Sequence, residues 1–158
     1  MALGILSDFI VSLVCFLGLF VGLLIGFMAR EELKAGKKYF LYLQKVVFIL
    51  VVFFVFYDFE FWLLGLLFVV FFSILLFQIK KDYHRVLYFV LAAFLFMSFF
   101  EENMVVPALV FFYGFPTGSL FYLEAKQKKV FDLVRELFFR YWYFLLIIIV
   151  LLLLKLIL

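Results

Sequence analysis

The chain has 158 residues, 71% of them hydrophobic, a net charge of +3 and a mean hydropathy of +1.33. A soluble domain of this length is nearer half apolar, and the excess here falls in long runs, so the composition excludes an ordinary soluble domain and predicts an integral membrane protein. The basic residues lie in short segments between the apolar runs, which is typical of membrane orientation and argues against a nucleic-acid-binding surface.

Six apolar runs have the character of membrane-spanning helices, which need about 20 residues each. The sequence therefore predicts an all-α protein, a six-helix transmembrane bundle that forms one domain over residues 1–158. The first run lacks a basic start and a small-residue cleavage site, so it is expected to be a retained helix. The stretch from Phe40 to Ile79 is too long for one crossing, and its acidic segment around Asp58 and Glu60 marks the expected turn. The predicted spans are 7–29, 40–57, 61–79, 86–100, 104–123 and 141–158.

The basic residues also indicate how these spans are oriented. All but one of the 14 Lys and Arg residues follow the first, third or fifth span, whereas the connections after the second and fourth spans contain none. The positive-inside rule makes the basic side cytoplasmic, so we expect both termini outside a cell membrane. Lys155 is the exception, and its long side chain is expected to reach the outer interface.

An amphipathic helix is predicted over residues 128–140, before the sixth span. Its apolar residues recur at helical spacing, with charged residues on the other face. Such a helix either rides on the inner membrane surface as a connector or docks a partner. The apolar positions are Val130, Leu133, Val134, Leu137 and Phe138.

Three glycines in the first span, Gly18, Gly22 and Gly26, are spaced four residues apart and share one helical face. Because glycine has no side chain, such a face lets another helix backbone approach closely in lipid. The sequence therefore predicts a helix-packing face. It leaves open whether the partner is another span of this chain or a second copy.

The fifth span carries the unusual segment Gly-Phe-Pro-Thr-Gly-Ser near its middle. Pro116 cannot donate to the carbonyl of Phe112, and the residues around it add backbone freedom, so a kink or break is expected near residues 114–118. Freed backbone groups and nearby hydroxyls bind ions or substrates in some transporters. This segment is the candidate ligand or pathway site, and the alternative is a plain packing kink. Its residues are Gly114, Pro116, Thr117, Gly118 and Ser119.

Acidic residues gather at the expected outer ends of the spans. Together they could form an acidic mouth that concentrates cations. Alternatively they cap helices, as the positions of Asp8 and Asn103 suggest. The candidate mouth consists of Asp8, Asp58, Glu60, Glu101 and Glu102.

Few features favour catalysis. Cys15 is the only cysteine, which excludes a disulfide or a cysteine-based metal site within the chain, and the only histidine, His84, lies in a charged loop. Tyr57-Asp58 and Pro107-Ala108-Leu109 resemble the YD and PAL motifs of intramembrane aspartyl proteases. That resemblance implies a second aspartate in a GxGD motif, which the sequence lacks, and Asp58 falls in a turn. We therefore predict no enzyme, no metal and no cofactor.

The functional expectation is a non-catalytic membrane subunit or scaffold that assembles through its glycine face, as a homo-oligomer or in a larger membrane complex. The alternative is a small channel or facilitator for a cation or small solute, with an acidic mouth and a path past the broken fifth span. No charged residue lies in the middle of a span, which argues against a proton-coupled pump. The expected partners are membrane lipids and other membrane proteins, and no nucleic acid.

Overall fold

The computed structural model describes residues 2–78, 84–101, 104–125 and 129–157. Within these ranges the chain forms seven α-helices and no strand, which confirms the all-α class. The predicted helix-capping residue Asn103 lies outside the described residues. The helices are α1 (Ala2–Met28), α2 (Arg30–Asp58), α3 (Trp62–Gln78), α4 (His84–Ser98), α5 (Val105–Glu124), α6 (Val130–Tyr141) and α7 (Tyr143–Ile157).

Three of the described helices, α1, α2 and α5, are long and apolar enough to cross a membrane. α6 and α7 pass the same test together, with a bend of 41° between them, and would make a fourth crossing if they form one span. α3 and α4 are apolar but shorter, over Trp62–Leu76 and Val86–Ser98. The structure therefore supports a membrane protein with three or four candidate spans.

α2 begins much earlier than the predicted second span. It starts at Arg30, immediately after the corner at Ala29 that ends α1, so the basic segment expected to be a loop is helical. Its residues include Glu, Leu, Lys and Ala, which are strong helix formers. The helix therefore extends beyond the predicted span, because a charged helix can continue past the apolar part of a span, and the span bounds 40–57 stay a prediction.

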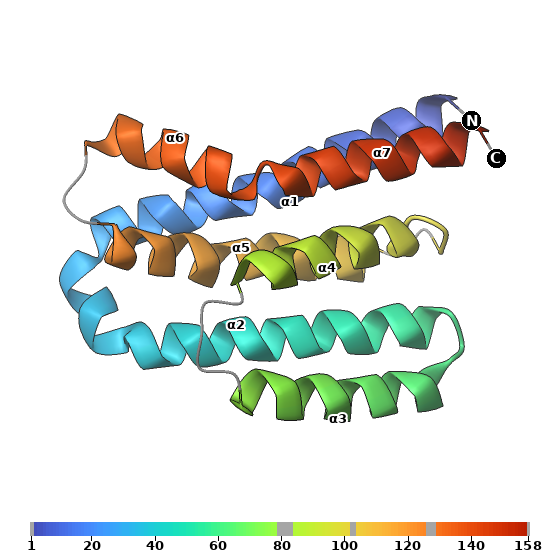
Figure 1. The fold of residues 1–158 in the computed structure, drawn as a ribbon, viewed down its shortest axis with the longest axis horizontal. Coiled ribbons are helices and arrows are strands. Elements are labelled where there is room, and N and C mark those ends of the chain that lie inside the picture. Colours follow the sequence, from blue (N-terminus) through green and yellow to red (C-terminus); the bar gives the residue numbers. More distant parts are fainter. Residues whose placement is uncertain (1, 79–83, 102–103, 126–128, 158) are drawn as a thin grey trace.

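α5 lies at the centre of the bundle (Figure 1). It packs along α1 on one side and along α2 on the other, and it also contacts α4. α7 packs against α1 and α4, whereas α3 packs mainly on α2 and lies at the edge of the bundle. The two motifs predicted to carry function, on α1 and α5, are therefore on neighbouring helices.

The ends of the helices fall into two groups (Figure 1). The chain termini, the α2–α3 turn, the end of α4 and the start of α5 lie at one end of the bundle, which we call the terminal end. The α1–α2 corner, the end of α5 and the start of α6 lie at the other, which we call the corner end. The predicted acidic turn is present, and Glu60 within it has a left-handed backbone with φ of 59°.

α6 covers most of the amphipathic segment predicted for residues 128–140. Of its predicted apolar positions, Leu133 and Leu137 are buried, whereas Val130, Val134 and Phe138 are exposed. α6 then continues into the apolar α7 after the bend. The amphipathic segment is thus the first part of a long bent helix pair.

The outer surface of the bundle is strongly apolar. α3 illustrates this, because Leu63 and Leu67 are 62% and 67% exposed, while Gly65 and Leu76 are among its few buried residues. A continuous apolar surface of this kind is unfavourable in water and typical of contact with lipid or another apolar surface. The exposed side chains thus support the same class of protein as the helix lengths.

Candidate functional site

The three glycines of the predicted packing face on α1 lie directly against α5, and Gly18 and Gly22 lie against its backbone. A Cβ atom added to Gly22 would lie 2.7 Å from the carbonyl oxygen of Gly114, and one added to Gly26 would lie 2.9 Å from the Cβ of Tyr122. A Cβ on Gly18 would overlap the carbonyl of Phe111. Each contact is closer than real Cβ atoms tolerate, so only glycine fits at these three positions without a shift of the neighbouring helix.

The opposing face of α5 is equally restricted. A Cβ on Gly114 would lie 2.5 Å from the carbonyl carbon of Gly18, and one on Gly118 would lie 2.7 Å from the backbone nitrogen of Leu23. The glycine face of α1 and the glycines around Pro116 are therefore the two sides of one close helix crossing. The sequence left the partner of the glycine face open, and in this structure it is α5 of the same chain.

Pro116 lies inside a continuous helix, so the structure shows no break at residues 114–118, and the kink that the sequence also allowed stays a prediction. α5 runs without interruption from Val105 to Glu124. A proline removes one backbone hydrogen bond, but tight packing on neighbouring helices can hold the flanking residues in helical geometry. Pro116 is buried, and α5 packs against both α1 and α2, which provides such packing.

The two hydroxyl groups of the candidate segment are buried and hydrogen-bonded. The Thr117 hydroxyl donates to the carbonyl oxygen of Tyr113 at 2.8 Å and accepts from Nε2 of Gln44 at 2.8 Å. The Ser119 hydroxyl donates to the carbonyl oxygen of Gly22 at 2.8 Å. These bonds tie α5 to α2 through Thr117 and to α1 through Ser119, which adds polar links to the glycine crossing.

Gln44 is a member of this site that the sequence analysis missed. Its side chain is 2% exposed, although an amide is costly to bury without partners. The sequence could have identified Gln44, because it is a polar residue inside the predicted second span, and such residues often form hydrogen bonds between helices in membranes.

A cluster of buried tyrosines was also missed. The ring of Tyr88 on α4 lies 5.5 Å from that of Tyr113 on α5 and 4.9 Å from that of Tyr141 on α6, measured between centroids. All three side chains are at most 2% exposed. Tyrosine is common throughout this sequence, so no local pattern distinguishes these three before the helices are packed.

The predicted acidic residues share the terminal end of the bundle but do not line one opening. The first part of α1, which holds Asp8, and the α2–α3 turn, which holds Asp58 and Glu60, lie at opposite edges of the bundle with α4 and α5 between them (Figure 1). Glu101 is exposed after α4, and Glu102 lies outside the described residues. The tertiary structure therefore separates the members of the candidate mouth that it describes.

Asp8 is not a helix cap, contrary to the expectation from its position in the sequence. α1 begins at Ala2, so Asp8 lies inside the helix. Its carboxylate pairs with Nζ of Lys155 on α7 at 3.1 Å, and the same ammonium group lies 4.9 Å from the ring centroid of Phe100. The one basic residue that departed from the positive-inside pattern therefore has an acidic partner at the terminal end.

A cavity of about 280 Å³ lies beside Asp8 at this end of the bundle. Residues of α1, the end of α4 and the start of α5 line it. Its polar lining residues are Ser7, Asp8 and Ser98. The Ser98 hydroxyl donates to the carbonyl oxygen of Leu95, so part of this polar lining is already hydrogen-bonded within α4.

Comparison with known proteins provides no functional assignment, because no protein-family model, curated protein or solved structure matches the chain. In the part of the chain that the structure describes, no three His, Cys, Asp or Glu side chains are grouped as metal ligands would be.

Proposed function

We propose that this protein is a non-catalytic membrane-embedded subunit or scaffold in a cell membrane. The observation that carries the proposal is the α1–α5 crossing. Its glycines pack against the opposing helix, the Ser119 hydroxyl bonds to the carbonyl of Gly22, and the Thr117 hydroxyl bonds to Gln44 and to the carbonyl of Tyr113, as expected of a rigid packing core. The segment around Pro116 is then a buried structural element, and the bundle acts by presenting its outer surface to lipid and to other membrane proteins.

Assembly in this proposal uses a different surface from the one suggested by the sequence. Engaging Gly18, Gly22 and Gly26 with a second protein would require α1 to separate from α5. A homo-oligomer or larger membrane complex would therefore form through other helices, whose exposed apolar side chains remain accessible in the bilayer.

A mass measurement after extraction in a mild detergent tests this proposal. The bare chain weighs 18.8 kDa, so an oligomer or a co-purified partner gives a protein mass well above that value. We expect such a mass in the mildest detergents and its loss in harsher ones, while the chain stays helical. A folded protein that is monomeric and without partners in every detergent, and in native membranes after cross-linking, would contradict the proposal.

We further propose six spans with both termini outside the cell. The arrangement of helix ends supports an alternating path, and Arg30, Lys34 and Lys129 share the corner end with its connections. α4 has 15 residues, a length of about 22 Å at the usual rise, so it would require local thinning of the bilayer.

Thiol labelling tests this topology. In a C15A background, cysteine at Glu60 or Glu101 is expected to react with a membrane-impermeant reagent added outside intact cells. Cysteine at Lys37 or Lys129 is expected to react only after the membrane is opened. Cys15 itself is 2% exposed, so its removal serves only to eliminate residual background. Labelling of the two lysine positions in intact cells, with protection of the two glutamate positions, would reverse the orientation.

The cavity beside Asp8 favours one second candidate, a small channel or facilitator for a cation or small solute. Under this alternative, Asp8 attracts the solute and Lys155 regulates access to it. Flux into vesicles should then rise in Lys155→Met and fall in Asp8→Asn. Equal flux in both variants and in protein-free vesicles would leave the scaffold as the remaining proposal.

A further inference from the structure

A second polar cavity lies at the corner end of the bundle, where four helices meet. It has a volume of about 390 Å³, within the range of small-molecule sites. Residues from the end of α1, the start of α2, the end of α5 and the start of α6 surround it. The lining consists of Phe27, Arg30, Lys34, Tyr122, Leu123, Ala125, Lys129 and Leu133.

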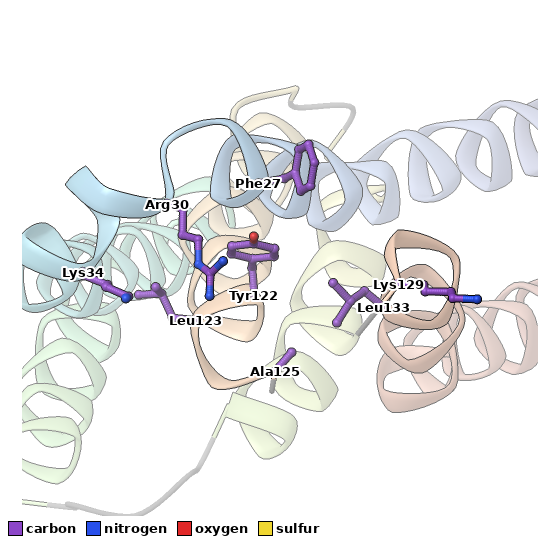
Figure 2. A pocket seen from close by; sticks show the side chains of 8 residues that line it. All are labelled: Phe27, Arg30, Lys34, Tyr122, Leu123, Ala125, Lys129 and Leu133. Carbon is purple, nitrogen blue, oxygen red and sulfur yellow. The ribbon is translucent and has the colours of Figure 1, made fainter. Parts of the chain in front are cut away.

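The charged groups of this cavity are all cationic. Figure 2 shows the guanidinium of Arg30 beside the ring of Tyr122, the ammonium of Lys34 near Leu123, and Lys129 on the far side of Leu133. Among the described residues, none of these three cations has an ion pair. The ammonium of Lys129 points away from the other two cations, so the cavity has two uncompensated positive charges, those of Arg30 and Lys34, and is complementary to an anion.

The acidic residue at the adjoining end of α5 does not neutralise this cavity. Glu124 follows the lining residue Leu123, but it is not among the residues that line the cavity. Its carboxylate lies 3.6 Å from the guanidinium of Arg140 on α6. The charge of Glu124 is thus directed to a different cation.

An apolar cavity of about 330 Å³ adjoins the cationic one. Phe27, Tyr122 and Leu133 line both, so the two cavities share a wall. The remaining residues of the apolar cavity are Phe20, Leu23 and Leu24 of α1, and Val130 and Val134 of α6. Leu24 is 60% exposed, which shows that this groove between α1 and α6 opens at the outer surface.

We propose that the two cavities together bind one anionic phospholipid. Arg30 and Lys34 hold the phosphate headgroup, and one acyl chain lies in the groove between α1 and α6. Arginine suits the role because its planar guanidinium donates two parallel hydrogen bonds to phosphate oxygens. Basic pockets between helices at a membrane surface are general features of anionic headgroup binding. A soluble anion would use the cations but would leave the adjoining apolar groove unexplained.

Lipid titration of the purified full-length chain tests this site. The protein is first delipidated in an uncharged detergent, then titrated with phosphatidylglycerol or phosphatidylcholine of identical acyl chains, and bound lipid is counted by native mass spectrometry. We expect phosphatidylglycerol to bind about tenfold more tightly or better, given the usual contribution of two basic groups near a membrane surface. Equal affinity for the two lipids would overturn the proposal.

Matched double variants separate the site from general positive charge. R30Q/K34Q removes two cations that line the cavity and should abolish the preference for phosphatidylglycerol. K37Q/K38Q removes the same charge from the same helix at positions that do not line it, and should retain the preference. Loss of the preference in both variants, or in neither, would contradict a specific site.

Two further arms distinguish a lipid from a soluble phosphate and test the groove. Inorganic phosphate and glycerol phosphate should displace phosphatidylglycerol only weakly, and displacement at matching concentrations would assign the cavity to a soluble anion.

Val134 is 37% exposed, so V134W can fill the groove without replacing a fully buried side chain. It should weaken binding of long-chain phosphatidylglycerol while circular dichroism shows an unchanged helix content. Unchanged long-chain affinity would overturn the acyl-chain half of the proposal.

Discussion

Replacing Gly22 with isoleucine is expected to prevent stable folding of the bundle. The new Cβ would lie 2.7 Å from the carbonyl oxygen of Gly114, which is backbone and cannot rotate away. α1 and α5 would have to separate, and the hydrogen bond from Ser119 to the carbonyl of Gly22 would be lost with them. Overpacking alone costs about 1–3 kcal/mol, and the lost bond adds to it. Thermal melting in detergent, followed by circular dichroism and by aggregation, measures the effect.

Gly4→Ile is the matched control for this substitution. Gly4 is on the same helix, and a Cβ added there has no heavy atom within 4 Å. The melting temperature of this variant should stay close to that of the unmodified chain. Similar losses in Gly4→Ile and Gly22→Ile would show that α1 tolerates no isoleucine for reasons unrelated to the crossing with α5.

Thr117→Val is expected to cost more stability than Gln44→Leu, although both remove the same hydrogen bond. Valine retains the approximate shape of threonine but leaves the buried amide of Gln44 without its acceptor at Thr117. Leaving a buried polar group unsatisfied costs about 1–3 kcal/mol, whereas Gln44→Leu leaves the Thr117 hydroxyl still bonded to the carbonyl of Tyr113. The double variant, which has neither polar partner, should be more stable than Thr117→Val alone.

Reversible unfolding in a denaturing detergent, carried out on all four proteins, measures this asymmetry. A positive coupling of about 0.6–1.7 kcal/mol between the two positions is the size expected for a hydrogen bond between helices in a membrane. Additive losses would mean that Gln44 and Thr117 contribute independently. If instead Thr117→Val leaves stability unchanged but abolishes flux through vesicles, the ligand-site interpretation of the fifth span would replace the structural one.

Much of the fold was predictable because long apolar runs and charged breaks are local features of a sequence. The helical class, the turn at Asp58–Glu60 and the amphipathic segment before the last apolar run each depend on residues close together in the chain. Helix boundaries were less predictable. The start of α2 at Arg30 was missed because a charged segment with good helix-forming residues resembles a loop when only hydropathy is considered.

The candidate site was predictable in its parts but not in its assembly. The sequence analysis selected Gly22 and Gly118 because the spacing of glycines and a proline within an apolar run can be recognised from the sequence alone. It could not show that their helices face each other, because that depends on which of several apolar faces pack together. Gln44 was missed for a related reason, since a polar residue in a span has no assigned role until its partner on another helix is known.

The sequence by itself determined that this is an apolar, all-helical chain with membrane-length segments, since composition and periodicity are properties of the chain alone. The tertiary structure decided the rest. It joined Gly22 to the segment around Gly118, kept α5 continuous through Pro116, and paired Asp8 with Lys155, which is 147 residues away. The physical reason is that close packing and ion pairing depend on distances across the bundle, and those distances are set by how the helices pack rather than by their order in the sequence.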